Sequence, residues 1–404
     1  MRVEKLILKN FRNVRGSVLV PEKGINFLVG ANGQGKTSFI EALGFLSSLK
    51  SFRDAKTANV IRWGCVDSEI LCTLTAAEAP DWKTDLRVHF NLVDAASAKA
   101  SKTAFINQKV LKSSTQYLSQ RFGSYELGFH SVVFNPSDHD LVRGDPGIRR
   151  SFLDRALAAE DFDYLLLLQK YQKILQQRNA LLKMGQEVSE PLLEGYTLPL
   201  IQVGSQVAIK RLEWILRLTP LLQKTLRRIV PQCPDLHLAY LSNWVPNLKD
   251  LSYDNKGLCP IHFTGQGQSP SLELLEQSFR ERATELSRAE RKSGYSLVGP
   301  HRDDWAFYLG GQPLKGQGSQ GEVRSALLAL KLSEIELFRA KTGHRPLFLL
   351  DDFSSELDQE RRAFLLDFLL TSDLQTFVTT TEESTGVGKR FHVRNGAVEE
   401  GKHD

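Results

Sequence analysis

A phosphate-binding motif is the feature that most constrains the fold of this chain. Residues 30–37 read Gly-Ala-Asn-Gly-Gln-Gly-Lys-Thr and match the pattern GxxxxGK[ST]. An apolar, strand-like run at 25–29 precedes the motif, and a helix-forming stretch at 36–49 follows it. The glycines let successive backbone N–H groups turn towards phosphate oxygens, and the helix adds the positive end of its dipole. A chance glycine-rich turn does not account for both flanks. The sequence therefore predicts a P-loop nucleotide-binding fold.

The positions of this loop have predicted roles at a bound nucleotide. Lys36 is expected to bridge the β- and γ-phosphates, and the Thr37 hydroxyl is expected to ligate Mg²⁺. ATP and Mg²⁺ are therefore the predicted cofactors. The loop residues predicted to bind ATP are Gly30, Ala31, Asn32, Gly33, Gln34, Gly35, Lys36 and Thr37.

A second apolar run, at 347–350, ends in two carboxylates. In a P-loop enzyme the first of them, Asp351, holds Mg²⁺ through water together with Thr37, and Asp352 orients or deprotonates the attacking water. Two acids after a strand are also typical of a helix N-cap. The P-loop favours the catalytic interpretation, which makes Asp352 the predicted catalytic residue.

Two further segments are typical of ABC-type ATPases. Residues 355–358 read Ser-Glu-Leu-Asp, so Ser355 and Asp358 are predicted to form a D-loop. Upstream, Ser319, Gln320 and Gly321 form a Ser-x-Gly turn at the start of a helix, which is a second anion-binding arrangement. In ABC-type dimers this signature acts on the nucleotide of the opposite protomer. The alternative is a flexible linker capped by Ser319.

Composition narrows the possible functions only slightly. The chain has 404 residues, 41% of them hydrophobic, and a net charge of +5 that leans weakly towards a polyanionic partner. Its four cysteines are widely spaced, which argues against a zinc site or a disulfide scaffold. Apolar runs are far shorter than the roughly 20 residues of a membrane helix. We expect a soluble, cytoplasmic protein with no membrane partner.

The order of strand-like and helix-like segments predicts an α/β architecture in two lobes. Residues 1–135 and 296–404 are expected to form the ATP-binding lobe I, with a mixed sheet and helices. Residues 136–295 are expected to form an inserted, mainly helical lobe II. Strand signals are seen at Leu297 and at 305–309. No heptad run is long enough for an extended coiled coil.

Several strings along the chain resemble the RecF family, whose members share the head fold of SMC proteins without their long coiled coils. The similar strings include residues 8–13, 133–137, 149–154 and 177–179, together with the P-loop and the acids described above. The most discriminating string is Gly-Pro-His-Arg-Asp-Asp at 299–304. The resemblance covers most of the chain.

This resemblance implies an ABC-type ATPase head that binds DNA at single-strand/duplex junctions as an ATP-dependent homodimer. It also implies work with RecR and RecO to load RecA during DNA repair, replication restart and the SOS response. Weak, DNA-stimulated ATP hydrolysis would act as the release switch. By resemblance to SMC-type heads, Arg12 is expected to reach the nucleotide.

The sequence also departs from the family pattern. Glu322 stands where the family usually has Gln, and Asp352 stands where ABC transporters place Glu. Residues 379–382 lie where transporters carry a switch His. These departures favour slow turnover. They leave open an alternative, a DNA-binding, SMC-like scaffold that holds ATP without significant hydrolysis. A transporter subunit is disfavoured because the LSGGQ string and the switch His are both missing.

Basic residues could contact DNA phosphates, but each is individually more typical of a solvated surface charge. His301 is clustered with two acids, which could suggest a metal or hydrolase site. The family resemblance implies instead a structural role or a role in coupling the lobes. The basic candidates are Lys50, Arg53, Lys56, Arg62, Arg149 and Arg150.

Overall fold

The apolar runs at 25–29 and 347–350 form two strands of one sheet, separated by a single strand. β3 (Ile25–Val29), β8 (Ser131–Phe134), β13 (Leu347–Leu350) and β14 (Thr376–Thr380) are buried along their whole lengths, as parallel strands covered on both faces are. The sheet order is β16-β15-β3-β14-β13-β8, in which only the pairing of β15 (Lys389–Arg394) with β16 (Ala397–Glu400) is antiparallel. β14 therefore lies between the strand that leads to the P-loop and the strand that leads to the two acids.

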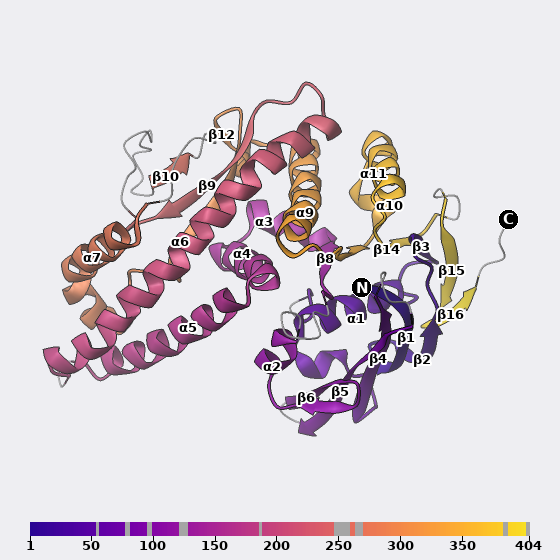
Figure 1. Cartoon of the computed structure of the whole chain (residues 1–404), viewed down its shortest axis with the longest axis horizontal. Helices are drawn as coiled ribbons and strands as arrows, with labels where there is room; N and C mark the ends of the chain where they lie inside the picture. The colour runs from indigo at the N-terminus through magenta and orange to yellow at the C-terminus, as the bar shows by residue number, and fades with distance from the viewer. Residues whose placement is uncertain are drawn as a thin grey trace. The chain divides into compact units, whose positions relative to one another are not determined.

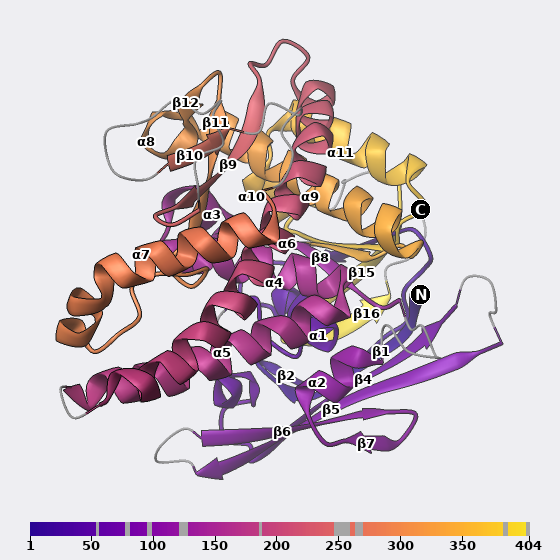
Figure 2. The same cartoon turned by 60° about the vertical axis from the view of Figure 1, so that its left-hand side comes forward.

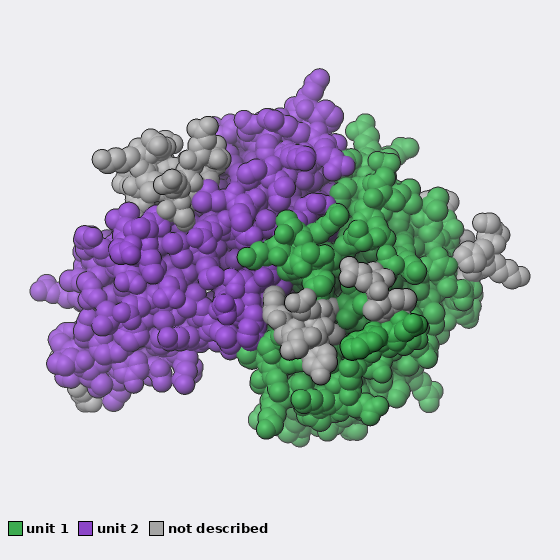
Figure 3. Space-filling model, in the orientation of Figure 1, with its two compact units in different colours: residues 1–138, 338–404 green, residues 139–337 purple. Residues whose placement is uncertain are grey.

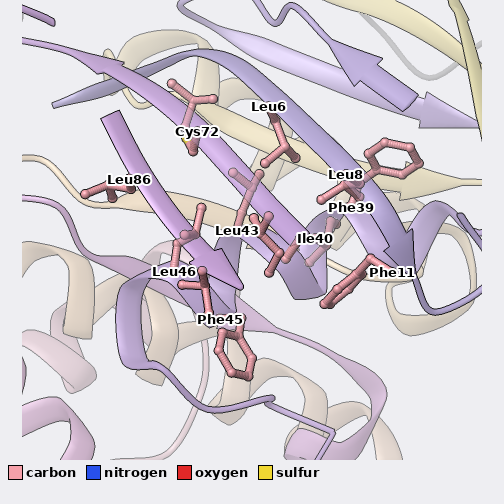
Figure 4. Packing of buried hydrophobic residues seen from close by; sticks show 14 of the residues in the cluster. Leu6, Leu8, Phe11, Phe39, Ile40, Leu43, Phe45, Leu46, Cys72 and Leu86 are labelled. Atoms are coloured by element: carbon pink, nitrogen blue, oxygen red, sulfur yellow. The ribbon is translucent and has the colours of Figure 1, made fainter. Parts of the chain in front are cut away.

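An antiparallel sheet covers the helix that follows the P-loop. Its order is β2-β1-β4-β5-β6-β7 (Figure 2). Apolar side chains of this sheet, such as Leu6 and Leu8, point towards Phe39, Ile40 and Leu43 of the helix (Figure 4). Packing of these apolar side chains stabilises α1 (Lys36–Ser48), a 13-residue helix that begins directly after the glycine-rich loop. The strands of the sheet are β1 (Arg2–Phe11), β2 (Val14–Leu19), β4 (Asp67–Thr75), β5 (Lys83–Asp94), β6 (Lys99–Ile106) and β7 (Lys109–Leu111).

This computed structural model describes residues 1–53, 56–76, 81–94, 99–120, 128–185, 188–245, 259–262, 270–382 and 387–400. The chain divides into two compact units, one of residues 1–138 and 338–404 and one of residues 139–337 (Figure 3). Both sheets described above belong to the first unit. Its remaining elements are η1 (Thr57–Val60), α2 (Ser114–Ser119), η2 (Pro136–His139), α10 (Phe353–Glu356) and α11 (Gln359–Thr371).

The second unit is mainly helical, with one small sheet of order β10-β9-β11-β12. Three long helices, α5, α6 and α7, pack side by side (Figure 1). The elements are α3 (Asp140–Arg143), α4 (Pro146–Glu160), α5 (Phe162–Lys183), α6 (Glu190–Ile229), β9 (Leu236–Ser242), β10 (Cys259–His262), α7 (Leu272–Ser293), β11 (Asp304–Leu309), β12 (Gln312–Pro313), α8 (Leu314–Gln317) and α9 (Gln320–Thr342), which continues into the first unit.

Residues 296–337 lie with the second unit, although the sequence predicts the return to lobe I at residue 296. The reason is strand pairing, because β11 pairs along its length with β9. The strand expected at Leu297 is wrong. The Leu297 backbone N–H instead donates to the Glu290 side chain at 2.7 Å, so no neighbouring strand is needed to satisfy it.

The string at 299–304 lies in a buried polar network of the second unit. The His301 ring contacts the Tyr171 hydroxyl at 2.6 Å and the Ser296 carbonyl at 3.0 Å. Burial lowers the pKa of His301 to about 4, so the ring is neutral near pH 7. Asp303 accepts hydrogen bonds from Tyr240, Ser242 and Trp244, and burial raises the pKa of Asp303 to about 6. These contacts join distant segments, which supports the structural interpretation of His301.

Over the residues that the structure describes, no helix pair extends into a long coiled coil, since the 40-residue α6 packs on α5 and α7 and contains Pro199 and Pro220. No helix in that part of the chain is long and apolar enough to span a membrane.

Candidate nucleotide-binding site

The phosphate loop connects β3 to α1 through backbone conformations that favour glycine. Gly33 has φ +78° and Gly35 has φ +105°. A Cβ added at Gly30 would lie 2.5 Å from the Val393 carbonyl oxygen, so this position is restricted by contact. The loop conformation therefore depends on the three glycines that carry the motif.

Lys36 folds back over the loop that precedes it. Its Nζ donates to the carbonyl oxygens of Gly30 at 2.5 Å and Ala31 at 2.9 Å. Burial lowers the pKa of Lys36, while Asp352 and Asp351 act in the opposite direction. The ammonium group is thus held inside the loop, where a phosphate oxygen could replace a carbonyl as its partner.

Thr37 and Asp351 meet across the sheet edge, although 314 positions separate them in the sequence. The Thr37 hydroxyl donates to Asp351 Oδ1 at 2.9 Å, and the Thr379 hydroxyl donates to the same oxygen at 2.8 Å. Burial raises the pKa of Asp351, while the hydrogen bonds from Thr379 and Thr37 act against it. A cation placed beside Asp351 would favour the ionised carboxylate.

The donor set fits Mg²⁺ as a ligand of a nucleotide complex. Thr37 and Asp351 supply a hydroxyl and a carboxylate, the hard oxygen ligands that Mg²⁺ prefers. Among the described residues, no group of three His, Cys, Asp or Glu side chains could hold a metal ion without other ligands. This matches the usual way in which Mg²⁺ is bound, by one or two protein groups together with phosphate and water.

Asp352 has a backbone conformation that non-glycine residues rarely adopt. Its φ and ψ are 58° and 54°, and it precedes α10 as the N-cap residue. The backbone N–H of Asp352 donates to the Thr379 hydroxyl at 2.8 Å. Left-handed backbone costs a non-glycine residue about 1–2 kcal/mol, and such strain is often found at functional sites. The predicted catalytic role of Asp352 remains a prediction.

Arg12 lies at the rim of the site and is held by a buried acid. Its guanidinium group forms a two-pronged ion pair with Glu41, with Nε to Oε2 at 2.9 Å, and also donates to the Asn59 carbonyl at 2.7 Å. Glu41 is fully buried and also accepts a hydrogen bond from Ser51 at 2.6 Å. Arg12 is therefore fixed in place, and its predicted contact with the nucleotide remains a prediction.

These residues line one large, open cavity of about 1470 Å³. Its polar end includes Lys36, Thr37 and both acids, and Arg12 contributes to its wall. The cavity continues past 61–66 to Leu92. It is larger than a triphosphate requires, so a nucleoside could also be accommodated.

Ser319, in the second unit, already has a partner for both of its donors. The backbone N–H and the hydroxyl of Ser319 each donate to Glu322 Oε2 at 2.8 Å, and the Glu322 N–H donates to the Ser319 hydroxyl oxygen at 3.2 Å. This arrangement is a capping box. The hydrogen bonds from Ser319 lower the pKa of Glu322. Gln320 and Gly321 begin α9 directly after it.

The predicted D-loop is divided between two helices. Ser355 belongs to α10, and Asp358 is the N-cap of α11, where its Oδ1 accepts the Arg361 backbone N–H at 3.0 Å. In this chain Asp358 therefore has a local structural role in addition to the predicted one.

Two of the candidate DNA-binding cations are engaged within the fold, Arg149 as a buried side chain and Arg150 as a partly buried one. Arg149 is buried and forms two hydrogen bonds of 2.7 Å to Asp304, and Arg150 donates to the Asp303 carbonyl at 2.8 Å. Burial lowers the pKa of Arg150. Because the Arg149 side chain is buried against Asp304, it does not fit a role as a DNA contact.

The sequence did not predict the contacts that two residues make at the site. Thr379 contacts Asp351, and Asn13 donates to the Gly33 carbonyl at 3.3 Å. Thr379 lies in the segment expected in place of a switch His, and its contact with Asp351 could have been expected from its position at the carboxyl end of a buried strand, where ligands of parallel sheets bind. Asn13 belongs to the family-like string at 8–13, but nothing in that string indicates a contact with the phosphate loop.

Comparison with known proteins finds similarity to one family along nearly the whole chain. The family model for the RecF/RecN/SMC N terminal domain matches residues 2–394. The DNA replication and repair protein RecF of Geotalea daltonii is 33% identical over 403 residues, which cover 100% of this chain and 99% of that protein. RecF of Halalkalibacterium halodurans is 37% identical over 383 residues, which cover 94% and 93% of the two chains.

Solved structures show similarity to the same family. The recombination mediator protein RecF in complex with ATP, described as part of the RecFOR pathway, superimposes with a TM-score of 0.83 at 27% identity and covers 99% of this chain and 97% of that chain. An SMC head domain from Pyrococcus furiosus superimposes with a TM-score of 0.54 at 14% identity, with 98% and 95% of the chains covered, and supports the fold alone. The predicted ABC-type, SMC-head-like fold is confirmed.

Proposed function

This chain belongs to the RecF family, and from that premise we propose that it is an ATP-dependent DNA-binding recombination mediator. One observation carries the proposal. Lys36, Thr37 and Asp351 converge on one cavity, and the Thr37 and Asp351 oxygens lie 2.9 Å apart. This is the arrangement that Mg²⁺-dependent triphosphate binding requires.

Each residue then has a defined task with ATP. Backbone N–H groups of 33–37 and the Lys36 ammonium group neutralise the phosphates, while Arg12 borders the same cavity. When bound, Mg²⁺ would supply Lewis-acid stabilisation between Thr37 and Asp351. Asp352 would orient the attacking water. Because an aspartate is shorter than a glutamate, we expect slow turnover that suits a release switch.

The proposed working state is a homodimer. Ser319, Gln320 and Gly321 of one protomer would contact the γ-phosphate held by Lys36 of the other, and Ser355 and Asp358 would lie at the same interface. Nucleotide binding then favours association, because a ligand that contacts both chains stabilises the dimer selectively. Hydrolysis removes that contact and releases the dimer.

The proposed ligand of the dimer is DNA at single-strand/duplex junctions, with little sequence specificity. Relatives are called DNA replication and repair proteins, and a similar structure is placed in the RecFOR pathway. On this basis we propose RecO and RecR as partners in loading RecA. Binding through phosphate contacts should weaken steeply with salt.

Anisotropy titrations of labelled gapped duplex with ATP, with ADP and without nucleotide test this function. The proposal expects tight binding only with ATP, a preference for gapped over fully paired DNA, and loss of the ATP effect in Lys36→Ala. Equal binding of gapped and paired DNA under all three nucleotide conditions would contradict it.

A second candidate is an SMC-like scaffold that binds DNA and ATP without significant hydrolysis. The shorter acid at Asp352 favours it. Multiple-turnover ATPase measurements with saturating DNA separate the two, because the scaffold makes no more product than one equivalent per site. Asp352→Asn should slow product formation only if the first candidate holds.

A further inference from the structure

Two turns that are remote in the sequence contact the outer side of the phosphate loop. One is the β1–β2 turn, which contains Asn13, and the other is the β15–β16 turn, which consists of Asn395 and Gly396. Both contact residues 33–35, the part of the loop whose backbone N–H groups would face phosphate. No motif in the sequence marks the β15–β16 turn, and the family-like string at 8–13, which includes Asn13, does not indicate a contact with the phosphate loop.

The β15–β16 turn is attached to Gln34 by two hydrogen bonds. The Asn395 backbone N–H donates to the Gln34 side-chain oxygen at 2.7 Å. The Gly396 backbone N–H donates to the Gln34 backbone carbonyl at 2.8 Å. Gln34 therefore binds this turn with both its side chain and its main chain.

Asn13 holds the preceding peptide group from the other turn. Its Nδ2 donates to the Gly33 carbonyl at 3.3 Å, and its Oδ1 accepts the Ser38 hydroxyl at 3.0 Å. A Cβ added at Gly35 would lie 2.8 Å from the Asn13 side chain, so the two are in close contact. Asn13 thus connects the loop to the first turn of α1.

These contacts fix the direction of two successive peptide groups. In a planar trans peptide the C=O and the following N–H point to opposite sides. The Gly33 and Gln34 carbonyls point outwards to the two turns, so the N–H groups of Gln34 and Gly35 point the other way.

We propose that Asn13, Gln34 and the Asn395–Gly396 turn are positioning residues, which hold the N–H groups of Gln34 and Gly35 ready for the phosphates of a nucleotide. The C-terminal hairpin is then part of the nucleotide-binding machinery, although it touches no reacting atom. The inference rests on the proposed function, because it presumes that the loop binds ATP.

The sequence offers a matched pair of substitutions to test this. Gly396 (φ +77°) and Gly311 (φ +79°) are each the second residue of a two-residue hairpin turn whose first residue also has positive φ. A Cβ on Gly396 would lie 2.9 Å from the Asn13 carbonyl oxygen and 2.9 Å from Val14 Cα, whereas a Cβ on Gly311 meets nothing within 4 Å. Alanine therefore strains the backbone of both turns, but only the Gly396 turn is also pushed away from Asn13 and Val14, and so from its position beside the loop.

Isothermal titration of the full chain with MgATP, and separately with inorganic tripolyphosphate, measures the effect. Gly396→Ala should raise the Kd for both ligands about tenfold, the expected result of losing roughly one charge-assisted hydrogen bond. Gly311→Ala should lower the melting temperature similarly but keep the wild-type Kd. Gln34→Met should reproduce the loss of affinity without any turn strain.

Amide hydrogen exchange provides a readout that does not depend on activity. The Asn395 and Gly396 amides should gain protection when tripolyphosphate binds, and Gln34→Met should lose that gain.

Several outcomes overturn the inference. These are wild-type Kd values in both Gly396→Ala and Gln34→Met, an equal loss in Gly311→Ala, or amide protection that does not respond to ligand. If Gly396→Ala fails to fold, Gln34→Met decides alone. Lys36→Ala separates a failure of the proposed function from a failure of the positioning role. Retained ATP binding in Lys36→Ala would contradict the proposed function. Loss of ATP binding in Lys36→Ala, together with a wild-type Kd in Gly396→Ala, would contradict only the positioning role.

Discussion

The Thr379 hydroxyl donates to the Asp351 carboxylate at 2.8 Å and at the same time accepts the backbone N–H of Asp352, also at 2.8 Å. One buried side chain thus connects the predicted metal ligand to the predicted catalytic acid. This contact arises because β14 lies between β3 and β13 in the sheet. Because Thr379 contacts both acids, we expect a displacement of β14 to change the positions of Asp351 and Asp352.

Thr379→Val removes this connection while preserving shape. The partly buried Asp352 N–H loses its acceptor, and we expect the free energy of unfolding to fall by about 1 kcal/mol, at the lower end of the cost of an unsatisfied buried donor. We also expect a higher Mg²⁺ concentration for half-maximal ATP turnover, because Asp351 is no longer oriented. Urea unfolding and a magnesium titration of turnover measure the two effects. Thr376→Val, another buried threonine of β14, is the control and should leave the magnesium dependence unchanged.

Glu322→Gln should strengthen the ATP-dependent dimer. Glutamine preserves the capping box, but it removes a negative charge that lies 2.8 Å from the Ser319 hydroxyl, where the γ-phosphate of the partner would bind. We expect the dimer Kd with a non-hydrolysable ATP analogue to fall about threefold or more, on the scale of one charge near a helix terminus. Sedimentation equilibrium measures it.

Glu360→Gln is the matched control, because Glu360 is an exposed acid in the first turn of another helix, α11. An unchanged dimer Kd in Glu322→Gln, or an equal gain in the control, would show that Ser319 does not act on the nucleotide of the partner.

Asp303 and His301 should influence the pH dependence of stability in opposite directions. In the folded state the pKa of Asp303 is raised to about 6, so its stabilising contribution is complete at low pH and is lost as pH rises through about 6. The pKa of His301 is lowered to about 4, so it binds protons more readily in the unfolded state, and its contribution to stability grows from about pH 4 to the unfolded value near 6.5.

Single substitutions separate these two contributions. Relative to wild type, Asp303→Asn should gain unfolding free energy as pH rises from 4 to 7, and His301→Asn should lose it over the same interval. Each difference should change by up to about 1.4 kcal/mol per pH unit. Urea unfolding at half-unit pH steps measures it, and two variants with differences of the same sign would refute the assignment.

Arg149→Ala should destabilise the fold without weakening DNA contacts directly. Removing one partner of a buried ion pair costs about 3–5 kcal/mol, because Asp304 is left with uncompensated charge. Lys50→Ala, at an exposed site, should be nearly neutral for stability. Calorimetry and DNA titration at low temperature measure both properties. If Arg149→Ala kept wild-type stability but lost DNA affinity, Arg149 would be a DNA contact after all.

The sequence predicts the elements of the nucleotide-binding unit well, because local patterns determine them. The buried strand at 25–29 and the helix that starts at Lys36 are formed as expected, and so is the strand that ends before Asp351. Their meeting could also be anticipated, since carboxyl ends of parallel strands share one edge of a sheet.

Other features depend on pairing between distant segments, which one sequence does not reveal. The strand at 304–309 pairs with β9 and so joins the second unit, and Leu297 is held by Glu290 instead of by a strand. The place of Asn13 beside Gly35 follows from the path of two turns, not from any local pattern. Likewise, only the fold shows that Arg149 is buried against Asp304.

Light scattering tests the central claim, nucleotide-driven dimerisation, most directly. Wild type and Lys36→Ala would each be measured with ATP, with ADP and without nucleotide, in the presence and absence of gapped DNA. We predict a wild-type dimer that forms only with ATP and is tightened by DNA, and a Lys36→Ala protein that stays monomeric throughout. A wild-type oligomeric state that ignores the nucleotide, or a Lys36→Ala dimer that persists with ATP, would contradict it.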